Sequence, residues 1–167
     1  MSNKKMMTIS VFISIAIILS YLERMIPTPF LVAGAKLGLA NVVTIVTLAL
    51  MDKKSSLLIL LVRIVLVALM FSGFSSFLYS LTGGLLSYGA MSLMVSMKLK
   101  SVSLVGISVV GACLHNLGQV IVASILFSNW IIISYLPMLT LTGMITGIFV
   151  GLVANHLTRR LKLAGVL

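Results

Sequence analysis

Six long apolar runs with few or no charged residues constrain this chain more than any other feature of its sequence. They cover residues 6–26, 37–51, 55–71, 74–97, 102–127 and 130–156. A hydrocarbon core of about 30 Å needs about 20 helical residues at 1.5 Å per residue, and most of the runs approach or exceed that length. Only 8% of the residues are charged, whereas soluble domains average about 25%. The pattern predicts an all-α integral membrane protein, a bundle of six transmembrane helices that forms one domain over residues 1–167.

The basic residues lie mostly in the short connections between these runs. If the runs cross the membrane alternately, one side receives Lys4, Lys5, Lys53, Lys54, Lys98, Lys100, Arg159, Arg160 and Lys162. The other side receives only Arg24 and Lys36, and Arg63 lies inside a span. Because cytoplasmic loops carry the excess of Lys and Arg, both termini are predicted to be cytoplasmic. The net charge of +10 therefore indicates membrane topology and not nucleic-acid binding.

Several polar side chains lie inside the predicted spans at similar depths. Counting from the cytoplasmic end places Arg63 roughly 12 Å, Asn41 roughly 15 Å and His115 roughly 20 Å into the membrane. Asn116 and Gln119 follow on the same run, and Gln119 shares a helix face with His115. Because ionisable residues in a span are costly and commonly functional, this convergence predicts a ligand-binding site.

Each of these side chains also has a structural interpretation. Arg63 could be a cation bonded to backbone carbonyls inside the bundle. His115 could be a core histidine whose hydrogen bonds are satisfied. Asn116 and Gln119 could be interhelical hydrogen bonds, which are worth well under about 2 kcal/mol each. The sequence leaves these alternatives open.

The second run, residues 37–51, is short for a transmembrane helix. About fifteen residues give roughly 22 Å of helix, and Asp52-Lys53-Lys54 anchors the cytoplasmic end, so the outer end should begin inside the bilayer. Irregular backbone at that depth is tolerated where it lines a cavity. The helix N-terminus and Lys36 would then present positive charge to an anionic ligand from outside. A tilted span with Lys36 at the interface is the alternative. Glu23 is expected farther out, too far to pair easily with Arg63.

Stripes of small residues on three runs predict close helix packing. They are Gly143, Gly147 and Gly151; Ser72, Ser76, Ser80 and Gly84; and Ser10 with Ser14 and Ala16 with Ser20. Small residues four positions apart let helix backbones approach closely in lipid. Packing inside the bundle is favoured over partner docking for the last run, whereas the first run fits either purpose.

The sequence excludes several kinds of chemistry. Its two carboxylates, Glu23 and Asp52, lie far apart, whereas enzymes that bind magnesium diphosphate need several oxygen ligands together. The sequence has no zinc-type His/Cys set, no CxxC or CxxCH motif and no P-loop. The chain is therefore not expected to be an independent enzyme, and no intrinsic cofactor or metal site is predicted.

A series of motifs extends in order over nearly the whole chain. It comprises Glu23 with Ile26-Pro27-x-Pro29, then Gly34-x-Lys36-Leu37-Gly38-Leu39-Ala40-Asn41, Arg63, Ser80-Leu81-x-Gly83-Gly84, Gly111-Ala112-x-x-His115-Asn116-x-x-Gln119, Tyr135-Leu136-Pro137 and Thr146-Gly147. This series resembles the Gx transporter family, which is also labelled heptaprenyl diphosphate synthase component I. The resemblance implies a bacterial cell-membrane protein similar to the S components of energy-coupling-factor (ECF) importers. Those have six helices and an outward-facing site, and they dock a scaffold protein and two ATPases on small residues of the first helix, here Ser10, Ser14, Ala16 and Ser20.

Two functions follow from these residues and this resemblance. In the first, the chain binds a small amphipathic or anionic molecule from outside, such as an isoprenoid, a quinone precursor or a flavin-like compound. The residues predicted to contact it are Lys36, Asn41, Arg63, Ser80, His115, Asn116 and Gln119. In the second, which the resemblance implies, a non-covalently bound quinone or flavin relays electrons from (demethyl)menaquinone to an extracellular flavoprotein. A purely structural anchor for a partner is a third alternative.

Overall fold

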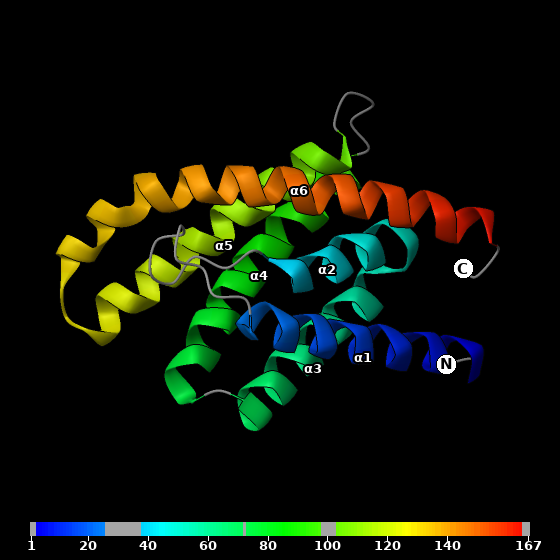
Figure 1. Cartoon of the computed structure of the whole chain (residues 1–167), viewed down its shortest axis with the longest axis horizontal. Helices are drawn as coiled ribbons and strands as arrows, with labels where there is room; N and C mark the ends of the chain where they lie inside the picture. The colour runs from blue at the N-terminus through cyan, green and yellow to red at the C-terminus, as the bar shows by residue number, and fades with distance from the viewer. Residues whose placement is uncertain (1–2, 26–37, 72, 98–102, 165–167) are drawn as a thin grey trace.

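The computed structural model describes residues 3–25, 38–71, 73–97 and 103–164. They form helices α1 (Asn3–Met25), α2 (Leu39–Leu50), α3 (Lys53–Phe71), α4 (Phe74–Ser96), α5 (Leu104–Leu126), the short 3₁₀ helix η1 (Trp130–Tyr135) and α6 (Leu136–Leu163), as Figure 1 shows. No strand occurs in this part of the chain. Five helical segments are long and apolar enough to cross a membrane, and α2 is shorter. The predicted all-α class and the six-helix count are therefore confirmed.

The helix bounds differ from the predicted runs where local signals outweigh hydrophobicity. Helix α3 begins at Lys53, two residues before the predicted start, because the Asp52 carboxylate accepts a 3.0 Å hydrogen bond from the Ser55 N–H. This is an N-cap, which satisfies a free backbone donor. Helix α6 begins after η1, with Pro137 in its first turn, and continues to Leu163, past the predicted end at 156. Its last turns are basic, and such residues are good helix formers that interact favourably with a helix C-terminus.

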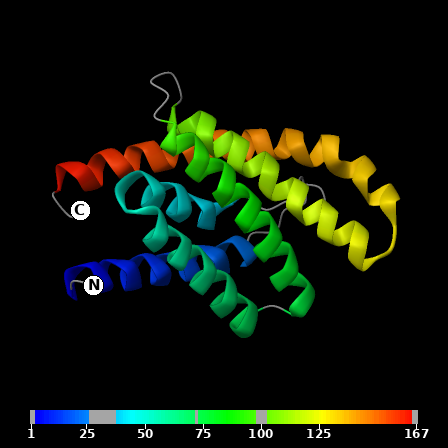
Figure 2. The same cartoon turned by 180° about the vertical axis from the view of Figure 1, so that it is seen from behind.

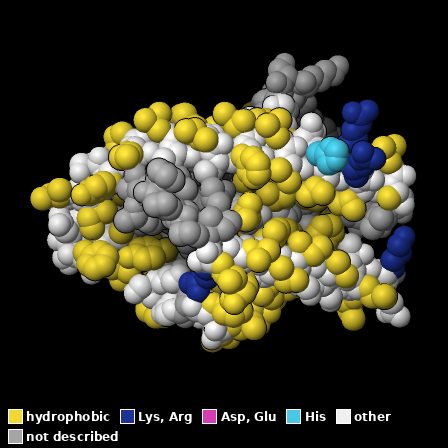
Figure 3. Space-filling model, in the orientation of Figure 1, with side chains coloured by type: hydrophobic (Ala, Val, Ile, Leu, Met, Phe, Trp, Pro, Cys, Tyr) yellow, Lys and Arg dark blue, Asp and Glu magenta, His cyan; other side chains and the backbone are white. Residues whose placement is uncertain are grey.

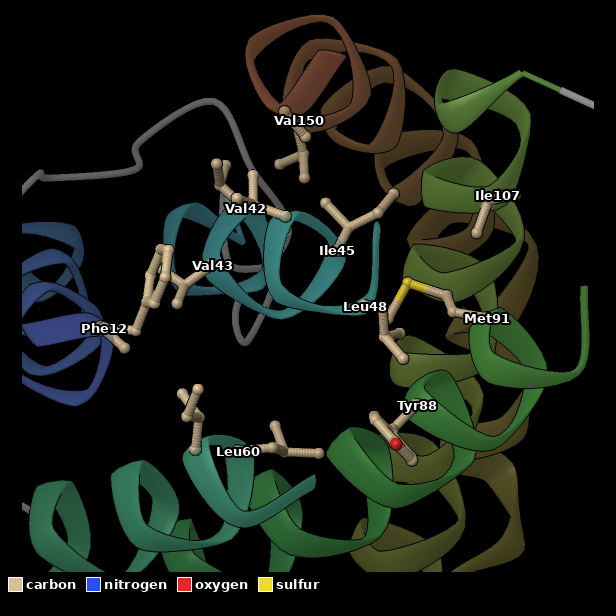
Figure 4. Close-up of a cluster of buried hydrophobic side chains, with 14 of the residues drawn as sticks. Phe12, Val42, Val43, Ile45, Leu48, Leu60, Tyr88, Met91, Ile107 and Val150 are labelled. Carbon is tan, nitrogen blue, oxygen red and sulfur yellow. The ribbon is translucent and has the colours of Figure 1, made fainter. Parts of the chain in front are cut away.

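Helix α2 lies in the middle of the bundle and contacts α1, α3, α4 and α6. Figure 4 shows its side chains among those of the surrounding helices, with Val43 beside Phe12 of α1 and Leu48 beside Met91 of α4. Most of its 12 residues are buried, as expected for a helix that is apolar on all sides. At 1.5 Å per residue it is about 18 Å long, which confirms that the second helix is short. Its depth in the bilayer stays a prediction.

The glycine stripe on α6 packs inside the bundle, against α5. A Cβ atom added at Gly151 would lie 2.5 Å from Val105 Cα, and one at Gly147 would lie 2.8 Å from Val109 Cα. Helices α4 and α5 are equally close where they cross, since a Cβ at Gly118 would lie 2.8 Å from Gly83 Cα. Close backbone contact of this kind holds helices together in lipid. For α6, the internal-packing interpretation is confirmed.

The first turn of α1 and the end of α6 lie at the same end of the molecule (Figures 1 and 2). Lys5 of α1 forms an ion pair with Asp52 in the α2–α3 turn, and Lys53 donates a hydrogen bond to Ser96 at the end of α4. The hydrogen bonds from Lys5 and Ser55 hold the pKa of Asp52 well below its usual range. In Figure 3 the basic side chains gather mainly at this end. The predicted alternation of the spans agrees with this arrangement, and the cytoplasmic orientation of this end stays a prediction.

The outer surface of the bundle is apolar. Large hydrophobic side chains are widely exposed on it, among them Leu69 at 78%, Phe74 at 74% and Ile131 at 73%. Figure 3 shows hydrophobic side chains over much of one face. An apolar surface of this extent is rare on soluble monomers and normal for lipid contact. The helices thus fit a multi-pass membrane protein.

Candidate functional site

A cavity of about 240 Å³ lies between the helices, and each of α1 to α6 contributes to its wall. The contributions come from the last turns of α1, the first turn of α2 and the C-terminal half of α3. Helices α4, α5 and α6 add residues along their middle parts. Because α1 and α3 start at the end of the bundle that carries the termini, the cavity lies toward the opposite end.

The structure brings most of the predicted ligand-contacting residues to this one cavity. Asn41, Arg63, Ser80, His115 and Asn116 all line it. Gln119 is absent from the wall and instead lies 3.1 Å from His115 Nε2, with which its side-chain amide forms a hydrogen bond. Lys36 lies outside the described residues. Four helices thus bring five predicted polar residues together.

Arg63 is the most unusual member of the wall. Only 7% of its surface is exposed, and it lies in the middle of α3. Within the described residues its guanidinium group has neither a hydrogen bond nor an ion pair shorter than 4.0 Å. The carbonyl bonds of the structural interpretation are therefore not observed. Because a buried charge without a partner is strongly destabilising, the cavity is electrostatically suited to an anion.

Glu23 lies at the same cavity, although the sequence placed it farther out. Its carboxylate accepts a hydrogen bond from the backbone N–H of Gly38, the residue before the first turn of α2. Gly38 has a φ of 74°, a left-handed conformation that favours glycine. The carboxylate thereby pairs with the backbone N–H of Gly38 and interacts favourably with the positive end of the α2 dipole. Glu23 and Arg63 form no ion pair, yet the charge of Glu23 acts on Arg63.

Sequence reasoning missed Glu23 because no local pattern connects it with a helix that begins 16 residues later. The available signal was its rarity, since the chain has only two acidic residues. The other acidic residue, Asp52, has a local structural role because it caps the N-terminus of α3. Glu23 has no such capping role within its own helix, so it was the acidic residue to consider for the site.

His115 is held on the cavity wall by close packing as well as by Gln119. A Cβ atom at Gly83 of α4 would lie 2.7 Å from the backbone oxygen of His115 and 3.1 Å from its ring. Gly83 therefore allows α4 to approach the imidazole directly. The i,i+4 pairing of His115 and Gln119 agrees with the helix face that the sequence predicts.

Asn116 connects α5 with α6. Its side-chain Nδ2 donates a 2.6 Å hydrogen bond to the backbone oxygen of Leu139, and a Cβ at Gly143 would lie 2.7 Å from that nitrogen. The interhelical interpretation of Asn116 is therefore confirmed. The same side chain also lines the cavity, so its two possible roles are compatible.

The inner part of the cavity carries hydroxyl groups that the sequence analysis did not single out. Ser87 and Ser108 line it and are 2% and 4% exposed. The Ser87 hydroxyl has no hydrogen-bond partner in the described part of the chain. Ser87 follows Ser80 by seven residues, so it shares that helix face. Extending the small-residue stripe of α4 inward would have found it.

The small residues of α1 face different ways. Ser10 and Ser14 are exposed, and their hydroxyls bond to backbone oxygens of their own helix. Ala16 is fully buried in the core, and Ser20 lines the cavity. Ala16 and Ser20 therefore do not form an exposed docking pair, because the helix turns them inward. Only Ser10 and Ser14 fit the predicted docking surface.

The family model described as heptaprenyl diphosphate synthase component I matches residues 12–157. The chain belongs to this family. The matched range includes every cavity residue named above. Comparison with curated proteins and with solved structures finds no match. The family description names one component of a synthase, which is compatible with a chain that is not an enzyme by itself. Together with the apolar helices, the match supports a membrane protein of the Gx transporter type.

Proposed function

We propose that this chain is the substrate-binding membrane component of an ECF-like transporter and that its cavity binds a small molecule with an anionic group. The observation that carries the proposal is Arg63. It is buried, lines the cavity and has no hydrogen bond to the described residues. A guanidinium group presents planar paired donors that match a carboxylate or phosphate, so an anionic ligand would supply the missing partner.

The neighbouring side chains are suited to orient such a ligand. Asn41 has both an amide donor and an acceptor, and His115 is fixed by Gln119. Apolar residues such as Val67 and Val150 line the same cavity and would contact the ligand body. A cavity with a few polar groups among apolar ones is the usual form of a small-molecule site.

The position of the cavity favours entry from the extracellular side. It lies toward the end of the bundle opposite the basic termini. If that basic end is cytoplasmic, as the positive-inside rule predicts, the cavity is closer to the outer surface. ATPase subunits and a scaffold would supply the energy for import, and Ser10 and Ser14 are the exposed small residues of α1 for such contacts.

Replacement of Arg63 tests the proposal. Purified wild-type protein in detergent and the Arg63→Gln variant are screened against anionic metabolites by thermal shift and native mass spectrometry. A charge-assisted hydrogen bond is worth about 1.5–3 kcal/mol, so Arg63→Gln should weaken binding by about 10- to 150-fold. Arg159→Gln, an exposed arginine near the end of α6, is the matched control and should bind normally. The proposal is contradicted if the anions that bind the wild type bind Arg63→Gln equally well. The contribution of Lys36 stays a prediction, which Lys36→Ala tests in the same screen.

The electron-transfer alternative predicts a different phenotype. Deletion should then abolish reduction of extracellular ferric iron and leave uptake of small molecules unchanged. Import predicts the reverse pattern. Proteins that co-purify with the chain from native membranes give a second test, because ATPase subunits support import and an extracellular flavoprotein supports electron transfer.

A further inference from the structure

We infer that the ligand of this cavity carries a single negative charge, as a carboxylate does, and that the cavity excludes diphosphates. The inference rests on the proposed function and names the ligand class for the same site. It separates this chain from the diphosphate that the family description mentions.

An anion of the protein itself is already present at the cavity. The carboxylate of Glu23 is hydrogen-bonded to the Gly38 N–H at the start of α2. This backbone position is where a phosphate group would otherwise bind, since helix N-termini attract anions. A diphosphate would have to displace Glu23 or lie beside its negative charge. A monoanion that binds Arg63 meets the same negative charge with less charge of its own, so the repulsion is smaller.

Two cations line the described part of the cavity wall. Arg24 and Arg63 supply positive charge to the described wall and Glu23 supplies negative charge, so one net positive charge is left. Arg24 also donates a hydrogen bond to the backbone oxygen of Phe71 at the end of α3. Of the two arginines on the described wall, Arg63 is the one with no hydrogen bond to a described residue. Within the described wall, one such cation neutralises one carboxylate, and the further charge of a diphosphate would meet no second cation of that kind there, which is costly.

The cavity wall also carries hydroxyl groups. Ser87, Ser108 and Thr146 supply them, and these side chains carry no positive charge that could hold a second anionic group. The unpartnered Ser87 hydroxyl instead fits a neutral oxygen or N–H of the ligand body. The volume of about 240 Å³ is below the roughly 300–1,000 Å³ of typical ligand pockets. The space therefore suits a compact monoanion.

Matched probes test the inference. Two series with the same carbon chains, monocarboxylates and the corresponding alkyl or prenyl diphosphates, are compared by thermal shift and native mass spectrometry on the purified full-length protein. Members of the carboxylate series should raise the unfolding temperature of the wild type and of Arg159→Gln, but not that of Arg63→Gln. The diphosphates should have no effect on any of them.

Glu23→Gln gives an independent readout. The glutamine oxygen can still accept the Gly38 N–H, so the fold should be retained while the negative charge is lost. Because like charges repel across a partly buried cavity, removing this unit charge from the wall should strengthen carboxylate binding measurably. This variant should also begin to bind diphosphates.

The outcomes distinguish the inference from the proposed function. If wild-type protein binds a diphosphate as tightly as its carboxylate counterpart, in a manner lost in Arg63→Gln, the inference is overturned and the proposed function stands. The inference is likewise overturned, and the proposed function again stands, if Glu23→Gln leaves anion affinity unchanged. If neither series binds in an Arg63-dependent manner, the proposed function fails and the inference fails with it.

Discussion

Substitution of Gly151 by alanine tests whether the contact between α5 and α6 holds the bundle together. The added Cβ would lie 2.5 Å from Val105 Cα and 3.1 Å from Ser108 Cβ, whereas ordinary contacts are 3.4–4 Å. The clashing atom belongs to the backbone, so no side-chain rotation relieves it, and the helices must separate by about 1 Å. Overpacking of this kind costs about 1–3 kcal/mol. Alanine has a helix propensity better than that of glycine by up to about 1 kcal/mol. We therefore expect net destabilisation of up to about 2 kcal/mol.

Gly89→Ala is the matched control for this substitution. Gly89 is an exposed residue of α4, and no atom lies within 4 Å of the Cβ that it would gain. This variant gains the same helix propensity without a clash, so it should be as stable as the wild type or more stable by about 0.5–1 kcal/mol. Reversible unfolding by SDS titration in mixed micelles, followed by circular dichroism, measures both. Equal stability of Gly151→Ala and Gly89→Ala would refute the packing argument.

Two further predictions concern polar contacts. Asn116→Ala removes the hydrogen bond to the Leu139 oxygen, and the same unfolding assay should show a loss of about 0.6–2 kcal/mol; an unchanged value would mean that the bond is not formed in the membrane protein. Asp52 has a pKa below its usual value because of its bonds to Lys5 and Ser55. A carboxylate with a lowered pKa in the folded state stabilises the protein above the unfolded-state pKa of about 3.9, and this contribution is lost as the pH falls below that value. Acidification from pH 5 to pH 2 should therefore lower the unfolding midpoint of the wild type more than that of Asp52→Asn, and equal losses would contradict this account.

The architecture could be predicted because hydrophobic length alone decides it. A run of about 20 apolar residues has no stable alternative to a helix in lipid, where every backbone group must be bonded internally. The order of the helices and the shortness of α2 follow from counting residues. The errors at the helix ends arose where a helix extends beyond its apolar run into polar residues. Examples are the cap at Asp52 and the basic turns that carry α6 to Leu163.

The candidate site could be predicted in part. Arg63 and His115 are conspicuous in apolar runs, and depth counting was enough to place them near one level. The rarity of acidic residues marked Glu23 as a candidate, but its contact with Gly38 was not predictable, because that contact depends on α1 ending beside the start of α2. Ala16 and Ser20 show the same limit, since a small-residue spacing does not say which way a helix face turns.

The sequence by itself determined the all-α fold class, the number of helices and which residues are too polar to face the lipid. Only the tertiary structure decided which of those residues share a cavity, which are satisfied by neighbours and which lack a partner. The physical reason is that hydrophobicity acts on each segment separately, whereas the rotation and crossing of helices depend on close contacts between several segments, such as Gly151 on Val105. Whether a buried charge has a partner is a property of those contacts.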